Sequence, residues 1–525
     1  MIRKHIFSVL ILLLCLTTAN AQDILFPAPA RLTFGNGEFR LGKNIQIEGN
    51  GKYAKTIAKK LKNSLKSYDC EQKKAKGHIS ISLDPASQMG KEAYQIKVSD
   101  NEIRLQAADE AGLYHAYETL LQMVKFGKGK IRSCEINNAP AYGWRGYMLD
   151  ESRHFFGKEK VKQYLDLMAM LHLNVFHWHL TDEPGWRIEI KRYPKLTTEG
   201  AIGNWHDPKA PAKFYTQKDI KEIVAYATER QIMIVPEFDM PGHATAVCRS
   251  YPEISGGGKG KWKHFTFHPC KEETYEFISH IFDELFELFP SPYIHIGADE
   301  VHYGNQSWFT DPVIQQFIKD KGLKNEVGME HYFIRRIADM VAQKGRTIIA
   351  WDEAIEANVS PDKLIVMWWR HDRPQQLKKA LEKGYRVILT PRRPMYADFV
   401  QHESHKVGRR WNGFCPIEDV YNFPKPLNHL IKGHEGQILG MQMNLWTERT
   451  ATEKRIDFMT FPRLVAASAA AWNTQEDKNC KLFMQQLPAF LKYLDQFNIY
   501  YFNPFNPDAT PEPNSPAKED VLQNG

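Results

Sequence analysis

Hydrophobic residues follow two different patterns along this chain, and the pattern changes near residue 141. Before that point, short segments alternate between apolar and polar residues, as half-buried strands do. These segments are 78–83, 94–98 and 103–106, and they are followed by a stretch with helical spacing at 110–124. The sequence therefore predicts a small α/β unit over residues 22–140.

From residue 142 onward, short and almost continuously apolar runs alternate with amphipathic stretches. The runs are 146–149, 173–180, 232–238, 293–297, 347–350, 364–367, 386–389 and 438–445. Apolar strands separated by helices predict a parallel sheet that is buried on both faces. Eight such β/α units over roughly 330 residues predict a (β/α)8 TIM barrel.

The helices between these runs have recognisable signals. Apolar residues share one face at 161–168 and again at 220–227, and Thr216 with Asp219 predicts a capping box in front of the second stretch. A further helix is expected at 482–497, packed on the barrel, so the barrel unit spans 141–503. Four prolines lie between 507 and 516, which predicts a flexible tail over 504–525.

The first residues predict an exported protein. Arg3 and Lys4 precede an apolar run at 6–16, and Ala19-Asn20-Ala21 fits a cleavage site. The expected signal peptide is 1–21, cleaved after Ala21, and the mature chain is expected in the periplasm or outside the cell. The apolar run is too short for a mature membrane span, and no later stretch is predicted to cross a membrane.

Charge and cysteine content exclude two classes of protein. The formal charge is +7, and it falls to +5 without residues 1–21, which contain Arg3, Lys4 and no acid. Because no basic run is dense, the sequence does not predict nucleic-acid binding. Six cysteines would remain after cleavage, and they do not form a CxxC pair that indicates structural zinc. They fit either buried thiols or disulfides, and Cys248 with Cys270 is the first pair to test.

Polar and aromatic residues follow the apolar runs at their carboxyl ends. The residues at these ends are Asp150, His179, Asp182, Glu237, Asp239, His243, Asp299, Glu300, Trp351, Trp369, Tyr396, Asp398, Trp446 and Glu448. Barrel enzymes form their active sites at this end of the strands. The pattern therefore predicts an active site that all eight strands contribute to.

The adjacent acids Asp299 and Glu300 indicate glycoside cleavage of an unusual kind. Most retaining glycosidases place two carboxyl groups ~5–5.5 Å apart on opposite sides of the bond. Neighbouring strand residues point to opposite faces, so these two acids make a poor pair for that mechanism. We expect Glu300 to protonate the leaving oxygen, while Asp299 orients a 2-acetamido group whose carbonyl oxygen attacks C1.

Eight stretches of the chain resemble glycoside hydrolase family 20, the exo-acting β-N-acetylhexosaminidases. They are RGYMLDESRHF (145–155), NVFHWHLTDEPGWR (174–187), PEFDMPGH (236–243), HIGADEV (295–301), AWDE (350–353), MWWR (367–370), PMYADF (394–399) and GMQMNLWTE (440–448). They follow the whole predicted barrel in order, and 22–140 resembles the small domain that precedes it in this family.

The resemblance implies a role for each matched residue. Glu300 would be the general acid and base, Asp299 the acetamido polariser, and Asp182 with His243 a relay that raises the proton affinity of Glu300. Trp351, Trp369 and Trp446 would enclose the acetamido group, and Tyr396 would bind its oxygen. Arg145, Asp398 and Glu448 would bind sugar hydroxyls. The implied reaction retains configuration, needs no metal or cofactor, and removes terminal β-linked GlcNAc or GalNAc from a carbohydrate.

Two positions depart from the family pattern. Glu183 stands where an Asp or Asn is common, and Glu151 where small or apolar residues are common, which leaves fine specificity open.

Three other functions compete with this resemblance. A metal-dependent barrel hydrolase could use His177 and His179, with His243, His295 and Asp299 completing the shell. A sugar-binding protein that has lost catalysis would lack one acid, but Asp299 and Glu300 are both present. A chitinase-like enzyme would carry a D-x-x-D-x-D-x-E strand, which this sequence does not contain. The sequence therefore favours the family 20 interpretation over all three. The sequence does not fix the oligomeric state.

Overall fold

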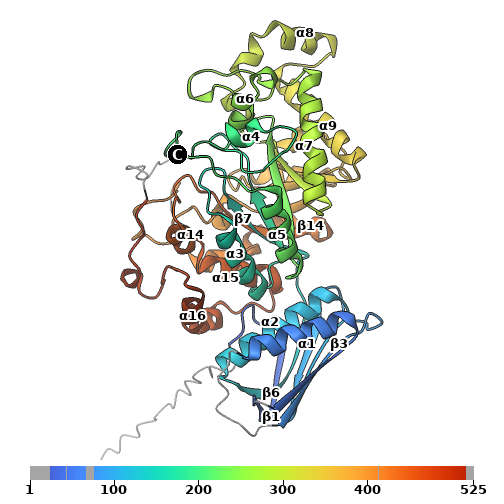
Figure 1. Cartoon of the computed structure of the whole chain (residues 1–525), viewed down its shortest axis with the longest axis vertical. Helices are drawn as coiled ribbons and strands as arrows, with labels where there is room; N and C mark the ends of the chain where they lie inside the picture. Colours follow the sequence, from blue (N-terminus) through green and yellow to red (C-terminus); the bar gives the residue numbers. More distant parts are fainter. Residues whose placement is uncertain (1–23, 43, 67–75, 412, 516–525) are drawn as a thin grey trace, which may run out of the picture.

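A computed structural model describes residues 24–42, 44–66, 76–411 and 413–515 of the chain (Figure 1). The expected signal peptide 1–21 and residue Cys70 lie outside the described residues. The described part consists of a small unit and a larger barrel. Among the described residues, no helix is both long and apolar enough to cross a membrane.

The small unit is a six-stranded mixed sheet with two helices on one face. Its strands are β1 (Arg31–Arg40), β2 (Asn44–Asn50), β3 (Lys76–Leu83), β4 (Tyr94–Val98), β5 (Glu102–Ala107) and β6 (Lys130–Asn138), in the order β1-β6-β4-β5-β3-β2. The helices α1 (Lys52–Lys66) and α2 (Glu110–Phe126) lie between this sheet and the barrel (Figure 1). The predicted strands and helix correspond to β3, β4, β5 and α2.

Eight parallel strands close into a barrel, which confirms the predicted TIM fold. They are β7 (Trp144–Asp150), β8 (Val175–His179), β9 (Met233–Met240), β10 (Tyr293–Gly297), β11 (Thr347–Trp351), β12 (Leu364–Trp368), β13 (Arg386–Leu389) and β14 (Ile438–Leu445). Apolar side chains from several strands pack together in one buried cluster inside the barrel, among them Val175, Val235, Ile349, Ile365 and Ile388. The barrel is therefore a packed core and not a pore.

Helices cover the outside of the barrel, with one exception. The main ones are α3 (Lys158–Met170), α5 (Gln217–Thr228), α7 (Glu272–Leu288), α9 (Glu326–Gln343), α10 (Pro374–Glu382), α14 (Glu453–Thr460), α15 (Arg463–Trp472) and α16 (Cys480–Leu494). Thr216 and Asp219 form the predicted capping box in front of α5. The connection from β11 to β12 contains only a 3₁₀-helix, η6 (Asp352–Ala357), so the expectation of eight complete β/α units is wrong there.

A buried ion pair joins the small unit to the amino end of the barrel. Arg145 is fully buried at the start of β7, and its guanidinium donates to Glu92 of the small unit. Glu92 also contacts His115 of α2 at 3.1 Å, and Arg145 lies 5.0 Å from the Trp472 ring. The prediction that Arg145 binds sugar hydroxyls is therefore wrong, because it lies at the barrel end opposite to the carboxyl ends of the strands.

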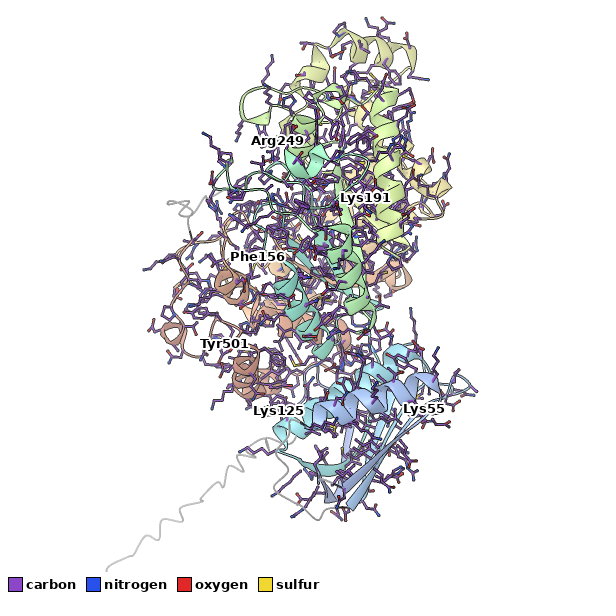
Figure 2. All side chains as sticks on the ribbon, viewed as in Figure 1. Lys55, Lys125, Phe156, Lys191, Arg249 and Tyr501 are labelled. Carbon is purple, nitrogen blue, oxygen red and sulfur yellow. The ribbon has the colours of Figure 1, made fainter. Side chains whose placement is uncertain are left out.

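Helices α1 and α2 of the small unit face the barrel. In Figure 2, Lys55 marks α1 and Lys125 marks α2, the two helices that face the barrel. A second contact between the units is exposed, where Lys60 of α1 lies 3.2 Å from Glu229, which follows α5 and is 65% exposed. The seam therefore contains one buried and one exposed ion pair.

Part of the expected flexible tail, residues 504–515, lies on the surface and is held by hydrogen bonds. The Glu512 carboxylate accepts the backbone N–H groups of Lys406 and Val407 at 2.6 and 3.1 Å. The fully buried Arg455 side chain donates hydrogen bonds to the Glu512 carboxylate and to the Pro513 carbonyl. The segment therefore braces a loop at residues 402–410.

The five described cysteines are free thiols, and Cys248 does not pair with Cys270. Both of these side chains are buried. Burial raises the pKa of the Cys248 thiol well above its ordinary range. Of the two possibilities left by the sequence, free thiols hold for the described cysteines, and all of these except Cys480 are buried.

We expect Glu92→Gln to lower the free energy of unfolding by about 3–5 kcal/mol, because it leaves the buried Arg145 charge without its partner. Burial raises the pKa of Glu92, but the hydrogen bond from His115 and the charge of Arg145 outweigh it and hold the pKa at about 2. The stabilisation is thus present above the unfolded pKa of about 4.3 and is lost as the pH falls toward 2. Urea unfolding at pH 7 and pH 3 measures both effects.

Glu229→Gln is the matched control for this substitution. It removes the exposed pair between the same two units, so the free energy of unfolding should change by less than about 1 kcal/mol. Equal effects of the two substitutions would contradict the assignment of Glu92 and Arg145 as the stabilising contact of the seam.

Candidate active site

A cavity of about 780 Å³ opens at the carboxyl ends of the barrel strands. All the predicted site residues except Arg145 and Asp398 line it. Those that do are Asp182, His243, Asp299, Glu300, Trp351, Trp369, Tyr396, Trp446 and Glu448. The rule that places barrel active sites at this end therefore located the cavity correctly.

The turn after β10 delivers both acids to the cavity. Gly297, Ala298 and Glu300 all have left-handed backbones, with φ of 65°, 69° and 51°. At Gly297 a side chain has no room, because a Cβ would lie 1.7 Å from the Asp239 carboxylate. A turn of this kind is costly for residues with a side chain, so the surrounding contacts must hold it.

This turn also overturns the expectation that Asp299 and Glu300 point to opposite faces. Both residues follow the last residue of β10, and the alternation of a strand does not extend to them. Nε2 of His243 lies 3.7 Å from Asp299 Oδ2 and 3.7 Å from Glu300 Oε2. The two carboxylates thus converge on one imidazole.

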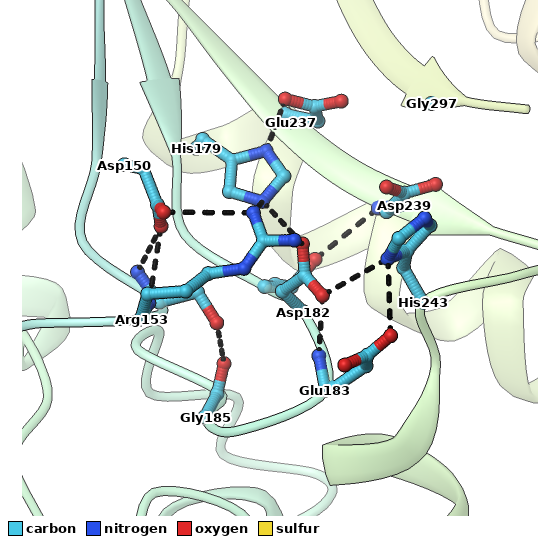
Figure 3. A network of polar contacts seen from close by, with 12 residues as sticks. Asp150, Arg153, His179, Asp182, Glu183, Gly185, Glu237, Asp239, His243 and Gly297 are labelled. Carbon is cyan, nitrogen blue, oxygen red and sulfur yellow. Dashed lines mark hydrogen bonds and ion pairs between the residues drawn. The ribbon is translucent and has the colours of Figure 1, made fainter. Parts of the chain in front are cut away.

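His243 belongs to a network of charged groups centred on Asp182 (Figure 3). The Asp182 carboxylate is 3.1 Å from His243 Nδ1, 2.9 Å from His179 Nε2 and 2.7 Å from Arg153 Nη2. Asp182 and His179 are almost fully buried. The predicted relay from Asp182 through His243 toward Glu300 is therefore present as a chain of contacts.

The electrostatics of the two acids differ from the expectation. Burial and the charge of Glu300 raise the pKa of Asp299 to about 7, against the opposing charge of His243. Burial also raises the pKa of Glu300, but the hydrogen bond and charge of His243 outweigh it and lower that pKa. The predicted rise in the pKa of Glu300 is thus wrong for the unliganded protein. Groups this close titrate as a unit, and Asp299 has the higher pKa of the two.

His243 remains charged in this arrangement. Burial lowers the pKa of its imidazole, but the charges of Asp182 and Asp299 outweigh burial and raise that pKa well above its ordinary range. Burial likewise raises the pKa of Asp182, and the charges of Arg153 and His243 outweigh it and lower that pKa. The relay therefore contains a carboxylate anion and an imidazolium.

Aromatic rings form the inner wall of the cavity. Trp351 ends β11, Trp369 follows β12 and Trp446 follows β14. The Trp351 ring centroid lies 6.5 Å from that of Trp369 and 5.9 Å from that of Trp446, and Tyr396 lies 6.2 Å from Trp446. Trp351 is 1% exposed and Trp369 9% exposed. These rings form an apolar wall at one side of the cavity.

Asp398 lies behind the cavity surface. Its carboxylate is 4% exposed and lies 2.8 Å from Nε of Arg409, which does line the cavity. Arg409 Nη2 also lies 2.8 Å from Glu448. Asp398 thus orients Arg409 in this structure, and its direct contact with a sugar hydroxyl stays a prediction.

The sequence prediction missed several lining residues. Arg153 lines the cavity, contacts Asp182 and lies over the Trp446 ring at 5.1 Å. It stands in the same motif as Arg145 but just after β7 ends, so the strand-end rule would have selected it. Arg409 had no such signal, because it lies in a long loop. The outer part of the cavity is lined by Trp205, Trp262 and Tyr303, which also went unpredicted.

The two positions that depart from the family pattern behave differently. Glu183 lines the cavity, lies 3.6 Å from His243 Nδ1 and has its pKa raised to about 7, chiefly by burial. Glu151 is fully buried, and it accepts hydrogen bonds from Trp178 and Tyr215. Glu183 can therefore affect the reaction, whereas Glu151 organises the loop after β7.

The alternative metal shell divides into separate groups. His177, Glu237 and His295 have potential ligand atoms within 4.8 Å of one another inside the barrel, and His243, Asp299 and Glu300 form a second such group. His179 contacts Glu237 and Asp182. Among the described residues, the expected shell of His177, His179, His243, His295 and Asp299 is therefore not one cluster.

Comparison with known proteins gives a consistent result over the whole described chain. The model of the glycosyl hydrolase family 20 catalytic domain matches residues 142–475, and that of the family's domain 2 matches 22–139. The β-hexosaminidase of Vibrio furnissii is 33% identical over 482 residues, covering 87% of this chain and 78% of that protein. The β-hexosaminidase of Porphyromonas gingivalis is 30% identical over 504 residues, covering 91% of this chain and 64% of that longer protein.

A solved structure shares the fold. The GH20 exo-β-N-acetylglucosaminidase from Vibrio harveyi, solved in complex with N-acetylglucosamine, superposes with a TM-score of 0.83 at 30% identity. The match covers 92% of this chain and 79% of that one.

Proposed function

We propose that this chain, which belongs to glycosyl hydrolase family 20, removes terminal β-linked N-acetylhexosamine, and GlcNAc in particular, from the non-reducing end of carbohydrates. The single observation that carries the proposal is the convergence of Asp299 and Glu300 on His243 beside the pocket of Trp351, Trp369 and Trp446. The GlcNAc preference is taken from the substrates named for its relatives.

The acetamido group of the sugar supplies the nucleophile in this proposal. Its carbonyl oxygen attacks C1, the bond from C1 to the leaving oxygen breaks, and Glu300 gives that oxygen its proton. Asp299 Oδ1 is buried and has no hydrogen-bond partner among the described residues, so the amide N–H is a suitable donor for it. Water then attacks C1 and loses its proton to Glu300, and the bond between C1 and the acetamido oxygen breaks. The product therefore has retained configuration.

Binding of the acetamido group moves the shared proton to the residue that needs it. A hydrogen bond to an ionised carboxylate favours ionisation, and the positive charge that grows on the amide nitrogen favours an Asp299 anion further. The proton that Asp299 holds in the unliganded protein then belongs on Glu300, which is 29% exposed and faces the cavity. Each acid thus reaches its working state only with the substrate present.

Arg153, Arg409 and Glu448 bind the sugar hydroxyls in this proposal. All three line the cavity, where Arg153 pairs with Asp182, and Arg409 pairs with both Asp398 and Glu448. A fixed guanidinium donates to hydroxyls without the cost of ordering a free side chain. Arg153 therefore takes the role that the sequence gave to Arg145.

Hydrolysis of p-nitrophenyl β-GlcNAc, compared with p-nitrophenyl β-glucoside, tests the reaction. We expect wild type to cleave p-nitrophenyl β-GlcNAc. For Glu300→Gln we expect a loss of about 10²–10⁴-fold in kcat/KM, measured with a β-GlcNAc substrate that has a poor leaving group and therefore needs the acid. The kcat/KM of wild type should fall as the pH rises through about 7, since the acid pair loses its proton there. Equal cleavage of the two wild-type substrates would contradict an acetamido nucleophile.

Arg153→Met and Arg145→Met form a matched pair that tests the corrected site. The first should reduce kcat/KM for p-nitrophenyl β-GlcNAc by about 10²-fold or more, since it removes hydroxyl binding and leaves Asp182 without one cation. The second should lower the melting temperature and leave kcat/KM of the folded protein within about 3-fold of wild type. The reverse result would indicate that Arg145, and not Arg153, binds the sugar hydroxyls.

We also propose export through residues 1–21, as their basic and apolar segments support. Expression of the full-length chain in a bacterium with two membranes should yield a protein in the periplasm or medium whose first residue is Gln22. Mass spectrometry of the amino terminus measures this. An intact chain in the cytosol would contradict the proposal.

A further inference from the structure

Glu237 is a buried carboxylate that the proposed reaction does not use. It lies near the end of β9 and is 0% exposed. Three imidazoles surround it. Its carboxylate oxygens are 3.0 Å from His177 Nε2, 2.8 Å from His295 Nδ1, and in close contact with His179 Nδ1.

Only one of these three imidazoles leads on to the active site in the described structure. His179 Nε2 lies 2.9 Å from Asp182 Oδ2, and Asp182 Oδ1 lies 3.1 Å from His243 Nδ1 (Figure 3). The other ring nitrogen of His177 faces Gln442 at 3.0 Å. Glu237, His179, Asp182 and His243 thus form a continuous row in which carboxylates and imidazoles alternate.

The position of His179 between two carboxylates determines its charge. A neutral imidazole donates from one nitrogen only, and His179 must donate from both to satisfy Glu237 and Asp182. Burial lowers its pKa, but the charge of Glu237 and the hydrogen bond to Asp182 outweigh burial and raise the pKa well above the ordinary range. Charge-assisted bonds are about twice as strong as neutral ones, so an imidazolium orients Asp182 more firmly than a neutral ring.

We propose that Glu237 and His179 are positioning residues for the reaction, which keep His179 doubly protonated so that Asp182 stays aimed at His243. This inference rests on the proposed function of the Asp182–His243–Glu300 relay. Neither residue lines the cavity, so both act through Asp182. The charged and titratable groups that face His179 and its partners are Asp150, Arg153, His177, Glu183, Asp239, His295, Asp299 and Glu300.

Glu237→Gln tests the inference through its pH dependence. The substitution removes the negative charge that keeps His179 protonated, so the pKa of His179 falls toward the ordinary value near 6.5. The kcat of Glu237→Gln on p-nitrophenyl β-GlcNAc, divided by that of wild type, should therefore fall about tenfold between pH 5 and pH 8. KM should stay within about 2-fold, because no sugar contact is altered.

Two further variants separate this effect from a general disturbance of the core. His177→Gln removes another buried partner of the same carboxylate, and the other ring nitrogen of His177 faces Gln442 and not Asp182, so its kcat ratio to wild type should be near one and flat with pH. His179→Gln should lower kcat about tenfold at every pH, because no titrating group remains at that position. A flat ratio for folded Glu237→Gln would overturn the inference. If Glu237→Gln does not fold, equal kcat values for His179→Gln and His177→Gln would overturn it.

A measurement without turnover distinguishes failure of this inference from failure of the proposed function. The ¹⁵N resonances of the His179 ring should show no titration between pH 5 and pH 8 in wild type and a titration in Glu237→Gln. A His179 ring that titrates in wild type would overturn the inference. A wild-type protein that does not cleave p-nitrophenyl β-GlcNAc would overturn the proposed function, whatever the ring titration shows.

Discussion

The Asp182 carboxylate is the contact on which the arrangement of the active site depends. It forms an ion pair with Arg153 and accepts hydrogen bonds from His179 and His243, and these three residues come from three different strand ends. A buried anion is costly unless it is paired with cations and hydrogen-bond donors, so the Asp182 carboxylate holds all three side chains in place. Asp182 thereby positions Arg153 in the cavity lining, His179 in the barrel core and His243 beside both acids.

The turn after β10 makes two neighbouring acids act on one site. A regular strand would separate Asp299 from Glu300, but three left-handed residues rotate both toward His243. Asp239 lies so close to Gly297 that no other residue fits there. The environments of the two acids then differ in exposure and hydrogen bonding, which is the usual way in which one pair of carboxyl groups acquires two roles. In the proposed reaction, this chain thus needs no second carboxylate across the sugar.

The sequence predicted the parts of this structure that follow from periodicity, and it failed where the chain leaves regular geometry. All eight barrel strands were located from their apolar runs, because both faces of such strands are buried. Arg145 was chosen over Arg153 because both stand in one motif, although only Arg153 lies at the carboxyl end of β7. The opposite-face argument failed because the backbone at Ala298 and Glu300 has positive φ, which residue identity does not signal. Arg409 and the bracing by Glu512 depend on contacts across about a hundred residues, which no local pattern encodes.

The two ends of the barrel carry different kinds of buried charge, and the difference explains why they can be altered separately. At the amino end, Glu92 and Arg145 neutralise each other across the seam with the small unit, and no cavity reaches them among those lined by described residues. At the carboxyl end, the row from Glu237 to Glu300 holds more carboxylates than fixed cations, so its proton content can change when a sugar enters. An ion pair whose two charges neutralise each other stabilises the fold. A row with more carboxylates than fixed cations can instead change its protonation when a ligand binds. The pair that stabilises the fold and the row that exchanges protons thus lie at opposite ends of the barrel strands.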